Sequence, residues 1–341
     1  MGLSQNTVSL ALRHDSRLPE ATRARVGEVA EQMGYRPDPL VAALMARLRT
    51  GRPVRARETL ACVLAGPARA RRAEHPSLER ALAGAKARAT ALGYGWSEFW
   101  LKDEKMSTKR LSSVLTARGI SGFIFHPDEA ADEVPDLPWE RHATAVLALL
   151  DRRLDGFHAA SIAPFRHVET ALQMALARGA KSAGLAMPAR YDRLLERLYT
   201  GAMASAGAFF PNLRLAPSFV GEQWDRAGFN AWWRKHRPKV VLTRAVEPLS
   251  WLEEEGVLKA RVGSCVHLGW HAGLGGAWAG VDPQAESVGA ACVDLVVEQL
   301  MSNERGFPAV PKLVLTAGRW VDGASLPQRF FNDSSDSDVL G

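Results

Sequence analysis

The spacing of apolar residues changes along the chain and predicts two kinds of structure. Close to the N-terminus, Gln5–Arg13 and Glu20–Met33 repeat apolar residues at the three- and four-residue spacing of an amphipathic α-helix. Ser4 is suited to cap the first helix, Gly34 is suited to end the second, and a polar turn with Pro19 separates them. We therefore predict a pair of short helices joined by a turn.

From Thr59 onward, strand and helix patterns alternate. Short apolar runs predict strands at Leu60–Ala65, Gly95–Trp100, Gly122–His126, Ala145–Leu149, His158–Ile162, Ser182–Met187, Leu213–Phe219, Lys239–Thr243, Val262–Leu268 and Ala277–Val281. Helical spacing predicts helices at Leu78–Leu92, Thr108–Arg118, Arg166–Arg178, Leu194–Ala206, Asp225–Lys235 and Ala285–Met301. This alternation is typical of parallel sheets covered on both faces, and two such sets predict an α/β core with two similar lobes.

A third short helix is predicted between these regions. Pro37-Asp38-Pro39 ends the second helix, and the apolar-rich segment Leu40–Leu48 follows it. Asp38 is suited to the N-cap and Pro39 to the first helical position. The segment is either a functional hinge helix or an ordinary linker between domains.

The composition narrows the class of protein. The chain has 341 residues, 47% of them hydrophobic and 23% charged, which is the balance of a globular protein with room for two cores. No apolar run is long enough to span a bilayer and no signal peptide is evident, so we expect a cytoplasmic protein without membrane contact. Cys62, Cys265 and Cys292 stand far apart in apolar segments and are expected to be core residues, without a disulfide or a metal site.

Positive charge is concentrated at the N-terminus. Ten arginines and five acidic residues give residues 1–57 a charge of +5, out of +6 for the whole chain. Such a segment is typical of a surface that binds nucleic-acid phosphates, although a solubilising arginine-rich surface has the same composition. Gln5, Asn6, Thr7 and Ser9 lie near the start of the first helix, where short polar side chains reach base edges and phosphates. Together, helix pattern and charge favour DNA binding.

Four short sequences in this region resemble the lactose-repressor (LacI/GalR) family of transcription regulators, at family order and spacing: Gly2-Leu3-Ser4, Thr7-Val8-Ser9-Leu10-Ala11-Leu12, Thr22-Arg23-Ala24-Arg25-Val26 and Gly34-Tyr35-Arg36-Pro37. The resemblance implies a partial helix-turn-helix head that lays Gln5–Arg13 in the major groove of operator DNA. It also implies a homodimer on a pseudo-palindromic operator, acting as a ligand-responsive repressor.

The resemblance assigns DNA contacts residue by residue. Gln5 and Asn6 are expected to read bases, while Leu10 stands where many members carry an arginine. In the hinge helix, Leu44 is the residue expected to enter the minor groove. The other positions expected at the DNA are Ser4, Thr7, Ser9, Arg13, Thr22, Arg23, Tyr35 and Arg36.

One part of the family head has no counterpart in the sequence. The resemblance implies another helix before Gly2, where only Met1 stands, and we expect an upstream start site to supply it. Without that helix, apolar side chains of Gln5–Arg13 lose cover, so the chain as written is expected to bind DNA poorly. The alternative function is a cytoplasmic small-molecule-binding protein that has lost DNA binding through this truncation.

The resemblance continues to about residue 323 and implies a core like that of periplasmic sugar-binding proteins. Three crossovers, near 155–162, 282–285 and 316–321, are expected to join its lobes. The implied boundaries are a head at 1–37, a hinge and linker at 38–57, a core at 58–328 and a disordered tail at 329–341. Lobe 1 is expected at about 58–157 and 285–317, and lobe 2 at about 160–282.

A small-molecule effector is expected in the cleft between the lobes, where the carboxyl ends of the parallel strands meet. The candidate effector-binding residues are His75, Ser77, His126, Asp128, Arg193, Arg197, Trp224, Trp270 and Asp282, with Arg193 and Arg197 as alternatives for one family arginine. After Lys239–Thr243, Arg244-Ala245 replaces the Asn-Asp pair that is common in the family. The loss of an acid that binds sugar hydroxyls argues against a plain hexose and favours an anionic or nonstandard effector, or none, over an ordinary carbohydrate.

Catalytic motifs are missing from the sequence. There is no P-loop, no GxGxxG after the first strand and no HExxH. Ser264, Cys265, His267 and His271 include possible nucleophiles and bases, but no acid is placed to orient them. We therefore expect no enzymatic activity and no cofactor.

Overall fold

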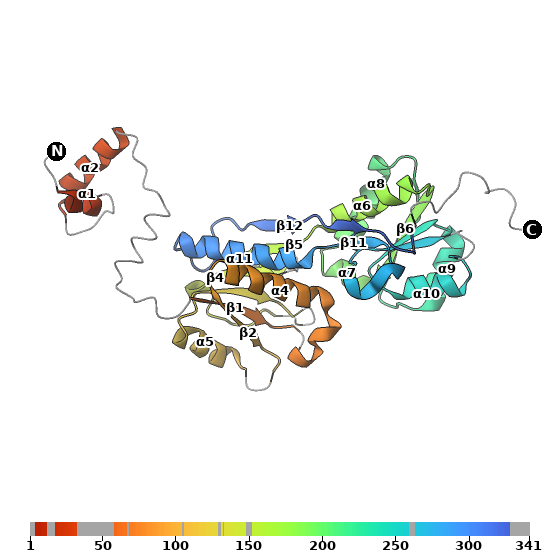
Figure 1. Ribbon diagram of the computed structural model, residues 1–341, viewed down its shortest axis with the longest axis horizontal. Helices are drawn as coiled ribbons and strands as arrows, with labels where there is room; N and C mark the ends of the chain where they lie inside the picture. Colours follow the sequence, from red (N-terminus) through yellow and green to blue (C-terminus); the bar gives the residue numbers. More distant parts are fainter. Residues whose placement is uncertain are drawn as a thin grey trace, which may run out of the picture. The chain divides into compact units, whose positions relative to one another are not determined.

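A computed structural model of the chain describes residues 4–11, 18–32, 58–66, 68–103, 106–128, 131, 133–147, 152–258 and 263–327 (Figure 1). It divides into two compact units, residues 1–56 and 57–341. The hinge helix predicted at Leu40–Leu48 and the tail at 329–341 lie outside the described residues. Among the described residues, no helix has the length and apolar character needed to cross a membrane.

The first unit contains the two predicted helices, α1 (Gln5–Ala11) and α2 (Glu20–Gln32). Ser4 caps α1, since its hydroxyl accepts a hydrogen bond from the Thr7 backbone N–H at 3.1 Å. Among the described residues of the pair, Ala11 and Val26 are buried apolar residues, each 1% exposed. The two predicted short helices are confirmed, and most of the turn predicted between them lies outside the described residues.

The second unit begins with a parallel six-stranded sheet in the order β12-β5-β4-β3-β1-β2. Its strands are β1 (Thr59–Leu64), β2 (Gly95–Trp100), β3 (Gly122–His126), β4 (Ala143–Leu147), β5 (His158–Ile162) and β12 (Leu313–Thr316). Its helices are α4 (Pro76–Ala91), α5 (Thr108–Ala117) and α11 (Ala285–Met301), with short 3-10 turns η1 (Arg69–Glu74), η2 (Trp139–Arg141) and η3 (Arg152–Leu154).

Side chains of β1 alternate between two cores, as the pleat of a strand requires. Leu60 and Cys62 pack in one apolar cluster with α4 and α11, and Ala61 and Val63 pack in another with α5. A strand covered on both faces needs a continuous apolar sequence, which explains the run at Leu60–Leu64.

A second sheet has the order β13-β11-β10-β9-β6-β7, with β8 also paired to β6. Its strands are β6 (Ser182–Pro188), β7 (Arg214–Leu215), β8 (Phe219–Gly221), β9 (Val240–Thr243), β10 (Ser264–His267), β11 (Gly280–Asp282) and β13 (Arg319–Val321). Its helices are α6 (Pro164–Ala177), α7 (Ala189–Arg193), α8 (Leu198–Phe209), α9 (Arg226–His236) and α10 (Glu247–Glu254), with the 3-10 segment η4 (Ala272–Ala277). The pairs are parallel except β11–β13, which is antiparallel.

The predicted α/β architecture with parallel sheets is confirmed, and two local predictions need correction. The strand predicted at Leu213–Phe219 is two short strands, because Pro217 between them has no N–H for a ladder bond and its carbonyl accepts from the Trp232 indole at 2.7 Å. The helix predicted from Leu194 begins at Leu198, after a turn in which Glu196 and Arg197 have φ of 51° and 60°. Strands β12 and β13 were not predicted.

Three connections join the two sheets, through Ala163 after β5, through Pro283 and Gln284 after β11, and through Ala317 and Gly318 after β12. The first connection follows Ile162, at the end of the predicted range, because β5 pairs with β4 in the first sheet.

Helices α4 and α11 approach so closely that only glycine fits at two positions of their contact. A Cβ on Gly84 would lie 2.0 Å from the Glu286 carbonyl oxygen, and a Cβ on Gly289 would lie 1.8 Å from the Ala81 carbonyl oxygen. Both clashes involve backbone atoms, which a rotamer change cannot relieve. The two helices therefore contact each other backbone to backbone.

Candidate functional site

The described head residues that were predicted to contact DNA lie in α1, at its N-cap and in the first turn of α2. Ser4 is exposed, while Thr7 and Leu10 on α1 are half-buried. Thr22 and Arg23 are half-buried in the first turn of α2, where both backbone N–H groups donate to the Pro19 carbonyl at 3.0 and 3.1 Å. Gln5, Asn6 and Ser9 lie on α1. Arg13, Tyr35, Arg36 and Leu44 lie outside the described residues.

A cleft of about 760 Å³ lies in the second unit and is lined by residues of both lobes. Gly66 and Pro127 follow strands of the first sheet, and Arg190, Arg244 and Gly269 follow strands of the second. These are the carboxyl ends of parallel strands, where open α/β sheets bind ligands. Its volume is within the range of small-molecule sites.

Four predicted effector-binding residues line this cleft: His75, Ser77, His126 and Asp128. His75 is exposed at the N-cap of α4, and Ser77 is half-buried in the first turn of that helix. Asp128 follows β3 and forms an ion pair with Lys102 at 2.6 Å. The first lobe therefore contributes a polar wall to the cleft.

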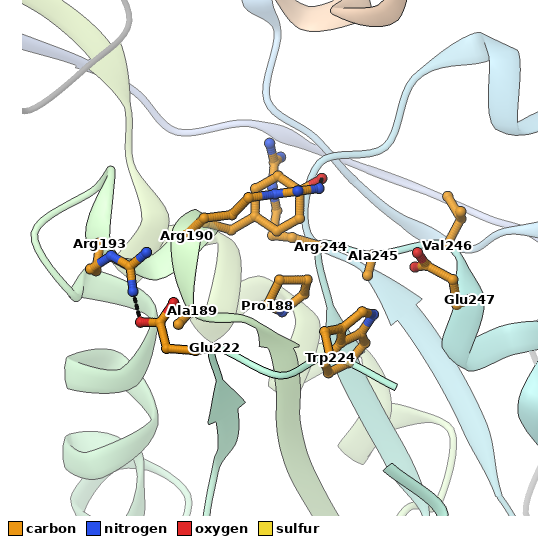
Figure 2. A pocket seen from close by; sticks show the side chains of 11 residues that line it. Pro188, Ala189, Arg190, Arg193, Glu222, Trp224, Arg244, Ala245, Val246 and Glu247 are labelled. Atoms are coloured by element: carbon orange, nitrogen blue, oxygen red, sulfur yellow. Dashed lines mark hydrogen bonds and ion pairs between the residues drawn. The ribbon is translucent and has the colours of Figure 1, made fainter. Parts of the chain in front are cut away.

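Arg193 and Trp224 line a smaller adjoining cavity of about 540 Å³ on the second lobe (Figure 2). Arg193 forms an ion pair with Glu222. Trp224 packs against Trp251 and Phe219, with ring centroids 5.4 and 5.7 Å apart.

The other three predicted residues line neither cavity. Arg197 is exposed at the start of α8, turned outward by its left-handed backbone. The Trp270 indole donates to the Trp278 carbonyl at 3.0 Å within the aromatic core. Asp282 is 5% exposed, and both its oxygens accept from Arg80. For these residues the position after a strand was a poor guide, because local turns and long-range partners decide where each side chain lies.

Five prominent cleft residues were not among the predicted effector-binding residues: Arg190, Tyr191, Arg244, His267 and His271. Each of them ends or closely follows a strand of the second sheet. This position in the sequence is the signal that could have identified them as cleft residues. Arg244 had been noted only as a departure from the family pattern. Arg190 and Tyr191 lie in α7, a helix too short for its own apolar periodicity.

Buried histidines around the cleft are neutral at pH 7. Desolvation lowers the pKa of His126 to about 4 and that of His267 to about 3, in the latter case assisted by the charge of Arg244. His126 Nδ1 lies 3.2 Å from the Leu147 carbonyl, so Nδ1 carries the proton. His267 Nδ1 accepts from the Gly269 N–H at 3.1 Å, so Nε2 carries the proton. The two rings therefore have opposite tautomers.

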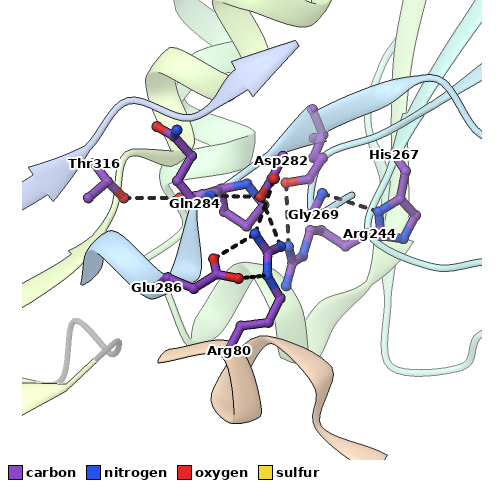
Figure 3. Close-up of polar contacts among 10 residues, drawn as sticks. Arg80, Arg244, His267, Gly269, Asp282, Gln284, Glu286 and Thr316 are labelled. Carbon is purple, nitrogen blue, oxygen red and sulfur yellow. Dashed lines mark hydrogen bonds and ion pairs between the residues drawn. The ribbon is translucent and has the colours of Figure 1, made fainter. Parts of the chain in front are cut away.

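An arginine network connects α4 to the second crossover (Figure 3). Arg80 donates to both Asp282 oxygens, at 2.9 and 3.1 Å, and to both Glu286 oxygens at 2.7 Å. The Gln284 N–H also donates to Asp282, at 2.8 Å. A bidentate arginine thus joins one lobe's helix to the chain where it leaves the other lobe.

Among the described residues, no arrangement is suited to bind a metal ion, and the cysteines are buried. No group of three His, Cys, Asp or Glu side chains in that part of the chain is arranged to hold a metal ion. Cys62, Cys265 and Cys292 are buried and unpaired, and burial raises the pKa of each thiol.

Comparisons with known proteins give consistent results for the two units. Residues 1–38 match the family model described as "Bacterial regulatory proteins, lacI family". A comparison of the chain with curated proteins found no match.

Solved structures of regulators share the fold. The Lac repressor dimer bound to operator and the anti-inducer ONPF is 16% identical with a TM-score of 0.53, and the match covers 96% of each chain. The transcriptional regulator CelR in complex with cellobiose is 15% identical with a TM-score of 0.52, covering 95% of this chain and 96% of that chain. The transcription regulator CcpA of Lactococcus lactis is 13% identical with a TM-score of 0.54, covering 79% of this chain and 99% of that chain.

At these identities the structural likeness establishes the fold, a two-lobed core like that of periplasmic binding proteins. The family match rests on the head, and the rest of the chain shares the fold of the solved regulators. Residues 1–38 match the lacI family of bacterial regulatory proteins, and the core has the two-lobed fold of the Lac repressor.

Proposed function

We propose that the protein is a ligand-responsive transcriptional repressor that binds a pseudo-palindromic operator as a dimer. The observation that carries this proposal is the lacI-family match of residues 1–38 in a chain whose second unit has a cleft of about 760 Å³. A repressor of this kind acts on chromosomal DNA and is therefore cytoplasmic. Binding is its function, and no catalytic step is assigned to it.

Helix α1 is the proposed reading helix. Its positions Gln5 and Asn6 read bases, and Ser9, Leu10 and Arg13 extend the same contact along the major groove. Ser4, Thr7, Thr22, Arg23, Tyr35 and Arg36 contact phosphates, in keeping with the net charge of +5 in residues 1–57. Leu44 is proposed to enter the minor groove from a hinge helix.

The cleft is the proposed effector site. Structures of two similar regulators hold cellobiose and the anti-inducer ONPF, which favours a small organic effector, either a carbohydrate or an anionic derivative. His75, Ser77, His126 and Asp128 are its proposed contacts in the first lobe. Effector binding changes the lobe angle and so the fraction of dimers competent for DNA, by no more than its differential affinity for the two states.

The test is selection of bound sequences from a pool of random DNA duplexes, followed by fluorescence anisotropy with the selected duplex. We expect saturable binding that weakens steeply with salt. Arg23→Ala should weaken binding to all duplexes alike and lower the salt slope by about 1. Asn6→Ala should instead change which duplexes are selected. Arg166→Ala, on an exposed position of α6 in the core, is the matched control and should leave both unchanged.

If no sequence is enriched from the pool, the repressor assignment is wrong for this chain. Repeating the selection with an N-terminal extension that encodes one more amphipathic helix then separates two cases. Enrichment only with the extension supports a head that needs that helix. Failure of both, with ligand binding retained, supports a small-molecule-binding protein without DNA binding.

A further inference from the structure

Arg244 occupies an unusual position in the cleft. It directly follows β9 and lines both the cleft and the smaller adjoining cavity, as do Arg190, Tyr191 and Val246. The two cavities therefore meet at this arginine. Arg244 is half-buried, so part of its charge is removed from water.

The guanidinium of Arg244 has few partners inside the protein. Its Nη1 donates to the Leu268 carbonyl at 3.4 Å, a long bond, and its Nε is buried without a hydrogen-bond partner. It lies against Gly269, where a Cβ would be only 1.5 Å from Nη1. No carboxylate of the described residues forms an ion pair with it. A partly desolvated charge normally has such a partner, and here the position is open.

Acidic residues near the cleft are held by other cations. Asp282 binds Arg80 at 2.9 Å, Asp128 binds Lys102 at 2.6 Å, and Glu222 binds Arg193. Glu247 lines the smaller cavity and forms no ion pair with Arg244 within the described chain.

The positive charge of Arg244 acts on its neighbours. It lowers the pKa of His167, His267 and His271, which desolvation has already lowered. These rings are neutral at pH 7 and add no charge of their own. The electrostatic potential where the two cavities meet is therefore positive, because no carboxylate of the described residues neutralises Arg244.

A second guanidinium adds to this field. Arg190 lies 4.7 Å from the centre of the Tyr191 ring and Arg244 lies 5.6 Å from the same centre. Arg190 also donates to the Tyr191 hydroxyl at 3.0 Å. In Figure 2 both arginine side chains reach the same part of the cavity wall. Two guanidinium groups therefore lie near one aromatic ring, and each has the planar set of N–H donors that binds a carboxylate or phosphate through two hydrogen bonds.

We propose that the junction of the two cavities binds the oxyanion of an acidic effector, a carboxylate or a phosphate ester, with Arg244 as its principal cation and Arg190 as the second. This inference rests on the proposed effector role of the cleft. The organic part of the effector extends into the larger cavity, against Leu78 of α4 and Ile162 of β5. In that position the ligand bridges the lobes, with its anion on the second and its body on the first. An uncharged sugar lacks the group that Arg244 requires.

The experiment follows thermal unfolding of the full chain in inorganic phosphate and in acetate, with ionic strength held constant by sodium chloride. We expect a saturable rise in Tm with at least one anion. Arg244→Gln should raise the apparent Kd about 10- to 100-fold, the loss expected for a hydrogen bond to a charged group. Arg190→Gln should have a smaller effect in the same direction. Arg166→Gln, an exposed arginine of the same lobe, is the control and should bind like the unmodified protein.

The relative strength of the two anions identifies the class of effector, since phosphate favours a phosphate ester and acetate a carboxylate. The proposal is overturned if neither anion gives a saturable shift, or if the shift is the same in Arg244→Gln and Arg166→Gln. These measurements need no DNA. Arg244-dependent anion binding by a chain that selects no duplex would therefore reject the repressor function alone, and the reverse result would reject the anion site alone.

Discussion

Replacing Gly84 with alanine tests whether the backbone contact between α4 and α11 holds the first lobe together. In an unhindered helix this change stabilises by about 1 kcal/mol, because alanine is the better helix former. At position 84 the new Cβ would lie 2.0 Å from the Glu286 carbonyl oxygen and 2.5 Å from its Cα. Ordinary contact begins near 3.4 Å, so the two backbones would have to separate by more than an ångström.

That separation would loosen the packing of the whole interface. A gap of about 0.5–1 Å already forfeits a quarter to a half of each dispersion contact. Ala81, Leu82 and Ala85 on α4 share a buried cluster with Val288 and Cys292 on α11, and all would lose contact. Overpacking costs about 1–3 kcal/mol, and the upper end applies because the obstructing atoms are backbone. After the gain in helix propensity, the free energy of unfolding should fall by about 2 kcal/mol.

Urea unfolding followed by tryptophan fluorescence measures this change. All ten tryptophans lie beyond residue 57, so the signal reports on the core alone. Gly207→Ala is the matched control, since Gly207 is an exposed position of α8 with nothing within 4 Å of a new Cβ. It should stabilise by about 0.5–1 kcal/mol. If the two variants shift the midpoint in the same direction by similar amounts, the inferred backbone contact is wrong.

Three further predictions concern other parts of the core. Arg80→Ala leaves Asp282, whose side chain is 7% exposed, without its main partner and should lower the free energy of unfolding in urea by about 2–3 kcal/mol. Arg88→Ala is the control. It removes an exposed ion pair with Asp294 and should lower the free energy of unfolding by less than about 1 kcal/mol. Burial holds the pKa of His126 near 4 and that of His267 near 3, so the unfolded chain takes up protons at a higher pH than the folded chain. The free energy of unfolding should therefore be constant above pH 7 and fall as the pH drops from about 6.5 towards 4. The expected slope is up to about 1.4 kcal/mol per pH unit for each histidine. His126→Gln should flatten that slope, and an unchanged slope would show that His126 does not contribute. The three buried thiols should react with Ellman's reagent only at the rate of unfolding, and rapid reaction of the native protein would contradict their burial.

Much of the fold is predictable because its signals are local. Strands such as Gly122–His126 are buried on both faces and therefore read as uninterrupted apolar runs. Strand β12 gave no such signal, since Leu313, Val314 and Leu315 lie at a sheet edge and are 37–52% exposed. Its identity as a strand depends on pairing with β5, far back in the sequence.

The site was only partly predictable for the same reason. His126 and Asp128 were predicted because they end or closely follow β3, at the edge where clefts form. Asp282 also follows a strand, but its partner Arg80 stands 202 positions away, and no local pattern indicates that pair. Arg197 was predicted in the cleft but lies outside it, because it belongs to a turn that the sequence pattern does not show. In that turn Asp192, 3% exposed, accepts hydrogen bonds from both the N–H and the hydroxyl of Thr200.

The order in which the two sheets are completed has a consequence for biosynthesis. Both β12 and α11, which complete the first lobe, come from residues 285–316, after the entire β6–β11 segment of the second lobe. While the chain emerges from the ribosome, α4 has no helix to cover it and β5 has an unpaired edge. The first lobe is thus translated first but can finish folding only near the end of synthesis. Until then its exposed apolar surface is a substrate for chaperones and a site of aggregation.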